Sequence, residues 1–184
     1  MGLKELSSQQ LCKLGETALA LELMNRGYDV INLNESLQNY MNADLLCMSG
    51  KTGEGIKIQV KTGTTKNIRC GLIAEPTTGV IQNLDDKIIC PWVFVHIAEC
   101  TTDDGKADFK FDFYVLLPDE TKELLRTAHH WYATQWDRQL TKNIQVGVDV
   151  PWLKASISKA SKHHPEYKSS LGCSAQDRWD KIAL

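Results

Sequence analysis

Three polar side chains on a short predicted β-hairpin could act together on a phosphate group. Asp44 precedes an apolar stretch, and Gln59 and Lys61 lie on the strand predicted at residues 56–62. Apolar and polar residues alternate along that strand, so we expect Gln59 and Lys61 to project together from the face opposite the core. A turn at residues 49–55 would bring Asp44 to within about one residue of the position opposite this pair. A carboxylate, an amide oxygen and an ammonium group in one place suit metal-assisted cleavage of a phosphodiester.

A fourth polar side chain, Glu16, lies in the apolar stripe of a predicted helix. We expect Ser7 or Ser8 to cap this helix, which runs to about Arg26 and is closed by Gly27. The residues of the stripe are Cys12, Leu19, Ala20 and Leu23. An acid in such a stripe is costly unless it is paired. Glu16 either reaches water or a lysine at the edge of the stripe or directs its carboxylate at a metal, and its combination with the hairpin favours the metal.

In this order, the four residues resemble the motifs of the PD-(D/E)XK nuclease superfamily, which includes restriction endonucleases, resolvases and some homing endonucleases. The resemblance covers residues 14–63: Gly15 and Glu16 on the helix, Asp44 on the first strand of the hairpin, and Gln59 and Lys61 in the (D/E)-x-K element. It implies an α/β fold with a central mixed β-sheet flanked by helices, in a single restriction-endonuclease-like domain.

The chain departs from the superfamily pattern at two positions. Ala43 stands before Asp44, where a proline is usual, and Gln59 stands where an acid is usual. Some members of the superfamily resemble this chain in using glutamine there. An amide oxygen can bind a hard cation such as Mg²⁺ but brings no negative charge. Glu16 is therefore expected to matter more as a compensating carboxylate.

The resemblance implies an endonuclease that hydrolyses phosphodiester bonds in DNA and depends on Mg²⁺ (or Mn²⁺). Asp44, the Gln59 amide oxygen and the Val60 carbonyl would bind the metal, and Glu16 would hold a second metal or the first one's water shell. Lys61 would position the attacking water and stabilise the charge that develops on the phosphate. The predicted catalytic residues are thus Glu16, Asp44, Gln59 and Lys61.

The other elements follow from shorter patterns. Further strands are predicted at residues 27–33, 90–97 and 109–117, and further helices at 118–138, from 151 onward and at 174–184. Residues 62–87 contain several turn signals and little periodicity, so they are predicted to be irregular or a short helix facing the substrate. The order of elements indicates one α/β domain over residues 1–184, with the core motifs at 14–63 and C-terminal helices at about 118–184.

The charge balance does not favour a nonspecific nucleic-acid binder, because 21 Lys and Arg face 23 Asp and Glu and the net charge is −2. Local basic sets could still bind DNA or could simply be solvated surface. One set surrounds the hairpin: Lys51, Lys57, Lys61, Lys66 and Arg69. The other is C-terminal: Lys154, Lys159, Lys162, His163, His164 and Lys168.

The sequence also predicts the compartment and the state of its thiols. No apolar run approaches the roughly 18 residues of a membrane span, and residues 1–10 have no secretory pattern. We therefore expect a cytoplasmic protein that does not bind a membrane. Its six cysteines form no C-x-x-C pair and are expected to be reduced and buried rather than zinc ligands.

Three hypotheses remain from the sequence. The first is an active DNA endonuclease, which as a homodimer could cut both strands of a duplex. The second is a catalytically inactive nuclease-fold protein that binds nucleic acid or protein, which Gln59 would permit. The third is a small cytoplasmic enzyme unrelated to nucleic acid.

Overall fold

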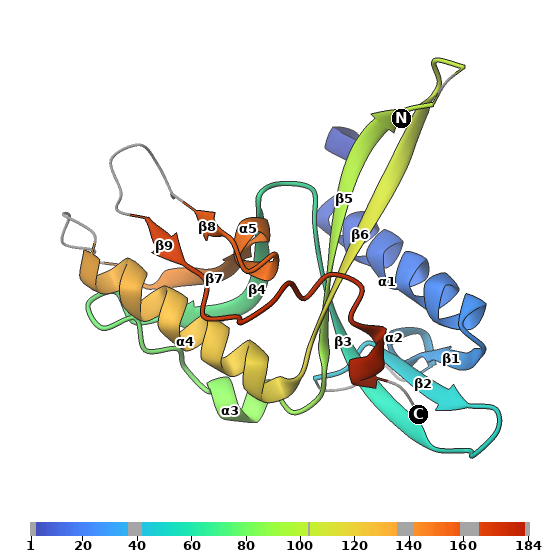
Figure 1. Ribbon diagram of the computed structural model, residues 1–184, viewed down its shortest axis with the longest axis horizontal. Coiled ribbons are helices and arrows are strands. Elements are labelled where there is room, and N and C mark those ends of the chain that lie inside the picture. The colour runs from blue at the N-terminus through green and yellow to red at the C-terminus, as the bar shows by residue number, and fades with distance from the viewer. Residues whose placement is uncertain (1–2, 37–41, 103, 136–141, 159–165, 183–184) are drawn as a thin grey trace.

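The computed structural model describes residues 3–36, 42–102, 104–135, 142–158 and 166–182. The strands of its central sheet are β1 (Tyr28–Asn32), β2 (Leu45–Ser49), β3 (Gly55–Gly63), β5 (Trp92–Thr101) and β6 (Ala107–Leu116), in the order β1-β2-β3-β5-β6 (Figure 1). Neighbouring strands are antiparallel except for the parallel pair β3 and β5. The predicted mixed sheet within a single α/β domain is confirmed.

Helix α1 (Ser8–Asn25) packs against this sheet and follows a short 3₁₀ turn, η1 (Leu3–Glu5). Ser7 caps it as predicted, because its hydroxyl accepts the Gln10 N–H at 3.3 Å and the Gln10 side chain accepts the Ser7 N–H at 2.9 Å. Leu19 and Leu23 are fully buried in the core between helix and sheet. Gly27, with a φ of +88°, then turns the chain into β1.

Strand β4 (Asn67–Ala74) corrects the prediction that residues 62–87 are irregular or a short helix. It pairs with β7 (Ile144–Asp149) in a separate two-stranded antiparallel sheet, and within the predicted range only α3 (Leu84–Lys87) is helical. The buried side chains of β4 are Ile68, Cys70, Leu72 and Ala74. This alternation is present in the sequence. Gly71, at an exposed position with φ +73°, lies in an irregular stretch of the pairing with β7.

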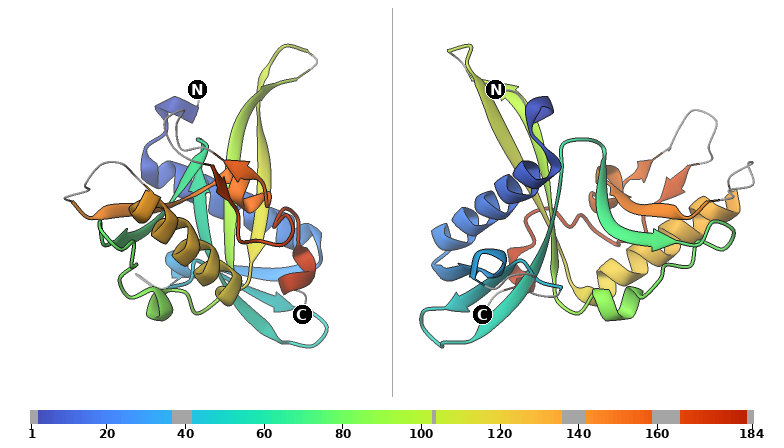
Figure 2. Two further views of the ribbon diagram at one scale, coloured as in Figure 1. Left: turned by 60° about the vertical axis from the view of Figure 1, so that its left-hand side comes forward. Right: turned by 180° about the vertical axis from the view of Figure 1, so that it is seen from behind.

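Helix α4 (Pro118–Gln135) packs with β4 and β7 in a second core beside the central sheet. Figure 2 shows this from behind, with α1 on one side of β3 and the β4–β7 sheet on the other. The predicted start of the helix at Pro118 is confirmed, whereas its predicted end at Arg138 lies outside the described residues. Among the described residues, no helix combines the length and apolarity needed to cross a bilayer.

Beyond α4 the prediction of helices up to residue 184 was mostly wrong. The elements there are β7, the single turn α5 (Val150–Leu153), the two-residue strands β8 (Ile157–Ser158) and β9 (Tyr167–Lys168), and the 3₁₀ turn η2 (Trp179–Ile182). Residues 174–177 lie along β6 instead of forming a helix. The Val115 N–H donates to the Ala175 carbonyl at 2.8 Å, and the Asp177 N–H donates to the Phe113 carbonyl at 3.0 Å. The Ala175 carbonyl and the Asp177 N–H thus bond to a strand distant in the sequence, instead of forming hydrogen bonds within a helix.

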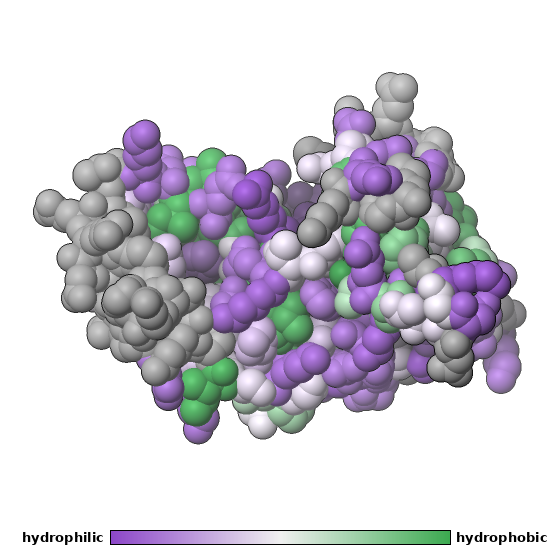
Figure 3. Space-filling model, turned by 90° about the horizontal axis from the view of Figure 1, so that it is seen from above, coloured by the Kyte–Doolittle hydropathy of each residue, from purple (hydrophilic) through white to green (hydrophobic). Residues whose placement is uncertain are grey.

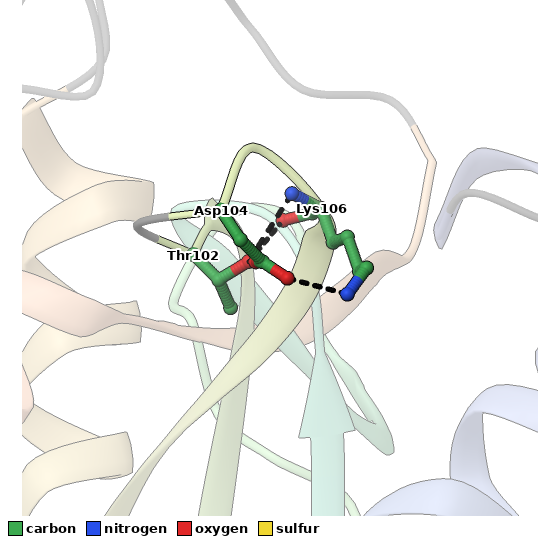
Figure 4. A network of polar contacts seen from close by, with 3 residues as sticks. All are labelled: Thr102, Asp104 and Lys106. Atoms are coloured by element: carbon green, nitrogen blue, oxygen red, sulfur yellow. Dashed lines mark hydrogen bonds and ion pairs between the residues drawn. The ribbon is translucent and has the colours of Figure 1, made fainter.

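Strands β5 and β6 confirm the predicted strands at 90–97 and 109–117 and extend further as a hairpin that projects from the domain (Figure 1). Its tip is held by local polar contacts (Figure 4). The Thr102 hydroxyl accepts the Lys106 N–H at 3.2 Å and donates to the Lys106 carbonyl at 3.0 Å, and the Lys106 ammonium pairs with Asp104. Contacts between residues two to four positions apart thus close the tip of the hairpin.

Candidate functional site

Asp44, which was predicted on the first strand of the hairpin, lies one residue before that strand, β2. Its backbone N–H and carbonyl are both hydrogen-bonded. Its N–H donates to the Ile58 carbonyl at 2.9 Å on β3, and its carbonyl accepts the Leu33 N–H at 2.8 Å. Leu33 begins the short helix α2 (Leu33–Ser36). Leu45 pairs with Ile58 in the hairpin, which places Asp44 opposite Gln59. The predicted register of the hairpin is therefore confirmed.

The Asp44 carboxylate receives hydrogen bonds from three groups. Its Oδ2 accepts the Val60 N–H at 2.7 Å and the Gln59 side-chain amide, and its Oδ1 accepts the Asn34 amide at 2.9 Å. The Gln59 nitrogen also lies 3.4 Å from the Val60 carbonyl oxygen. The Asp44 carboxylate and the Val60 carbonyl thus both lie beside the Gln59 amide. The sequence predicted all three groups as metal ligands.

Glu16 is connected to Asp44 through two asparagines. Its Oε2 accepts the Asn32 amide at 3.2 Å, and the Asn32 Oδ1 accepts the backbone N–H of Asn34 at 2.9 Å. Asn34 in turn binds Asp44. Neither asparagine was among the site residues predicted from the sequence. The spacing Asn-x-Asn where the predicted strand ends was the signal that could have indicated them, since an asparagine side chain often accepts the backbone N–H two residues on.

The charges of three predicted site residues affect the pKa of the Cys12 thiol. Cys12 is exposed, which corrects the prediction of a buried thiol. Partial desolvation still raises its pKa, the negative charges of Glu16 and Asp44 raise it further, and the positive charge of Lys61 lowers it. Glu16, Asp44 and Lys61 therefore lie within electrostatic reach of one point. Beside it, an open pocket of about 330 Å³ is lined by residues that include Cys12, Glu16, Asn32 and Asn34.

Lys61 lies on β3 two residues after Gln59 and is partly exposed. Its ammonium lies 5.0 Å from the centre of the Trp92 ring on the neighbouring strand β5. The negative face of an aromatic ring attracts a cation at this distance. Trp92 therefore restricts where this ammonium group can lie.

Helix α1 comes close to β3 because residue 15, just before Glu16, is a glycine. A Cβ atom at Gly15 would lie 2.0 Å from the Thr62 Oγ1 and 2.7 Å from its Cγ2. The backbone of α1 thus packs directly on the strand that carries Gln59 and Lys61. This close approach sets the position of Glu16 relative to the hairpin.

The oxygen atoms that these residues offer as ligands suit a hard divalent cation. Asp44 and Glu16 offer carboxylates, and Gln59 and Val60 offer neutral oxygens, which suit Mg²⁺ or Mn²⁺ rather than a soft metal. The Gln59 nitrogen faces Asp44, and half a turn of the amide would present its oxygen instead. The described part of the chain contains no group of three His, Cys, Asp or Glu residues suited to a metal. A cation would thus depend on the amide and carbonyl oxygens beside two acids.

The predicted basic sets are only partly described. Around the hairpin, Lys51, Lys57, Lys66 and Arg69 are exposed. In the C-terminal set, Lys154 and Lys168 are exposed, whereas residues 159 and 162–164 lie outside the described residues. The space-filling view from above shows a hollow between the side of the molecule that carries the β4–β7 sheet and the side that carries α1. Hydrophilic residues lie inside this hollow (Figure 3).

No protein-family model matches the sequence, and no curated protein matches it. Among solved structures, the chain is similar to the structure of a bacterial homing endonuclease, I-Ssp6803I, with a TM-score of 0.41 and 14% sequence identity. The alignment covers 96% of this chain and 91% of that one. With so low a TM-score and identity, a function has to be assigned from the geometry of the site itself.

Proposed function

We propose that this chain is a Mg²⁺- or Mn²⁺-dependent endonuclease that hydrolyses phosphodiester bonds in DNA, as a glutamine variant of the PD-(D/E)XK nucleases. The observation that carries the proposal is the carboxylate of Asp44, held against the Gln59 amide and the Val60 N–H, with Lys61 following on the same strand. Two of the predicted motif residues, Asp44 and Gln59, are thus in direct contact.

The ligands of the cation would be Asp44, the Gln59 amide oxygen and the Val60 carbonyl. Once bound, a divalent cation supplies charge that polarises a phosphoryl oxygen and lowers the pKa of a bound water. Asp44 already has one oxygen directed at Gln59 and Val60, so this ligand is positioned in advance. Glu16 would hold a second cation or the waters of the first.

Lys61 would act on the reacting phosphate. Its ammonium would donate hydrogen bonds to the attacking water and to the oxygen that gains charge in the transition state. The Trp92 ring beside it would restrict where that ammonium can lie. A compact charge on a flexible stem suits this role, because it can follow the phosphate as it changes shape.

The DNA backbone would approach through the exposed lysines and arginine around the hairpin. With a net charge of −2, binding would depend on this local set rather than on the whole surface. A homodimer would bring one site to each strand of a duplex. We expect the protein to act in the cytoplasm.

The first test is cleavage of labelled DNA by the full chain. Duplex, branched and single-stranded DNA are incubated with Mg²⁺, Mn²⁺ or EDTA, and wild type is compared with Lys61→Met and Lys110→Met. We expect cleavage that needs Mg²⁺ or Mn²⁺ and that falls by about 10²–10³-fold in Lys61→Met, because a stabilising donor is lost. Lys110 is an exposed strand residue on β6, so its variant should cut normally. Absence of cleavage by the folded protein, or full activity of Lys61→Met, would refute the proposal.

Restoring the acid at position 59 separates an active nuclease from a binding module that has lost catalysis. Gln59 is 9% exposed and contacts Asp44, so Gln59→Glu places two carboxylates together and raises the pKa of the new one. We expect lower stability at neutral pH, recovery as the pH falls or Mg²⁺ is added, and a changed rate or metal preference. Thermal unfolding with and without Mg²⁺, alongside cleavage, measures this. A variant indifferent to Mg²⁺ in both assays would favour the binding module.

A further inference from the structure

Asn32 and Asn34 lie between the two carboxylates of the candidate site. Asn34 donates its side-chain amide to the Asp44 Oδ1 at 2.9 Å, and Asn32 donates its own to the Glu16 Oε2 at 3.2 Å. The two asparagines are joined because the Asn34 N–H donates to the Asn32 Oδ1 at 2.9 Å. That bond fixes the Asn32 amide with its oxygen toward Asn34 and its nitrogen toward Glu16.

The backbone around the asparagines is fixed by its own hydrogen bonds. Asn32 is the last residue of β1 and pairs with Leu45, the residue after Asp44. Leu33, between the asparagines, donates its N–H to the Asp44 carbonyl at 2.8 Å. Both asparagines are therefore held in register with the aspartate rather than carried on a separate loop.

Neutral amides suit this position. Asn34 gives Asp44 a donor without adding charge, whereas an aspartate at 34 would place an acceptor with negative charge 2.9 Å from the same oxygen. Because Asn34 occupies Oδ1, the other oxygen of Asp44 is left directed at Gln59 and Val60. Both asparagines also line the pocket of about 330 Å³ beside Glu16.

We propose that Asn34, supported by Asn32, is a positioning residue of the cation site: it orients Asp44 toward Gln59 and Val60 and fixes Glu16 to the same framework. This inference rests on the proposed function, because it concerns the same cation. Partners of this kind, which orient a metal ligand without touching the metal, commonly change metal affinity by about 10–100-fold.

The test measures Mn²⁺ binding to the full chain by calorimetry, with the Mn²⁺ dependence of cleavage beside it. We expect Asn34→Ala to weaken Mn²⁺ binding by about 10-fold. The half-saturating Mn²⁺ concentration for cleavage should rise similarly, while the rate at saturating Mn²⁺ changes little. Asn143→Ala, at an exposed asparagine after the α4 region, is the control and should bind Mn²⁺ like wild type.

Asn34→Asp distinguishes a positioning role from a merely structural one. It should be less stable than wild type without cation, because two carboxylates meet, and Mn²⁺ should raise its thermal midpoint more than that of wild type. If the alanine and aspartate variants both lose stability but bind Mn²⁺ with wild-type affinity, the positioning role is wrong.

Asp44→Asn, measured in the same series, keeps the two proposals apart. If Asp44→Asn loses Mn²⁺ binding and Asn34→Ala keeps it, only the role of the asparagines fails. If wild type does not bind Mn²⁺, or Asp44→Asn binds it equally well, the proposed cation site fails and the role of the asparagines fails with it.

Discussion

Replacing Asp44 with asparagine is expected to abolish cation-dependent cleavage, lowering its rate by about 10³-fold or more, while the protein stays folded. Asparagine keeps an oxygen that can accept the Val60 N–H, now bonded at 2.7 Å, and the Gln59 amide. It loses the negative charge that a divalent cation needs in a site with only one other predicted acid. The two hydrogen bonds from Val60 and Gln59 become neutral ones, and the Asn34 amide loses its acceptor, so we expect a stability loss of about 1–3 kcal/mol.

Single-turnover cleavage at saturating protein, with circular dichroism melting beside it, measures both effects. Asp29→Asn is a suitable control, because Asp29 is an exposed carboxylate on β1. Alanine at 44 is a poorer test, since it would leave the Val60 N–H and the Gln59 amide without their acceptor. Cleavage by Asp44→Asn at the wild-type rate would show that the site has been placed on the wrong residues.

Gly15→Ala is expected to destabilise the protein by about 1–3 kcal/mol, although alanine favours a helix over glycine by about 1 kcal/mol. The added Cβ would lie 2.0 Å from the Thr62 Oγ1, so α1 or β3 must move. Because Glu16 follows Gly15 and Thr62 follows Lys61, the same movement would separate the predicted site residues. We therefore also expect slower cleavage by the variant.

Urea unfolding of Gly15→Ala, Thr62→Ala and the double variant tests this contact. Thr62→Ala removes the two closest atoms, so the double variant should lose less stability than the sum of the single ones. Gly172→Ala is the control, because a Cβ there would meet nothing within 4 Å. Additive losses would mean that Gly15 and Thr62 do not limit the approach of α1 to β3.

Local patterns determined the parts of this protein whose partners lie nearby in the sequence. Ser7 and Gln10 are three residues apart, and the capping bonds they make define the start of α1. Alternation along β3, with a short turn before it, was enough to set Asp44 opposite Gln59. In such cases the chain between the partners is short, so few alternative pairings compete. The catalytic roles of Asp44 and Gln59 remain predictions.

Tertiary contacts alone decided the rest. Strand β4 pairs with β7, so that Asn67 lies opposite Asp149, and residues 174–177 lie along β6. The junction of Asn32 and Asn34 with Glu16 and Asp44 needs α1, β1 and the hairpin together. A sequence pattern shows which face of a segment is apolar, but it does not show which distant segment covers that face or accepts its hydrogen bonds. These pairings follow from the packing of the whole chain. The contacts of Asn32 and Asn34 with the two acids could therefore be assigned only in the folded protein.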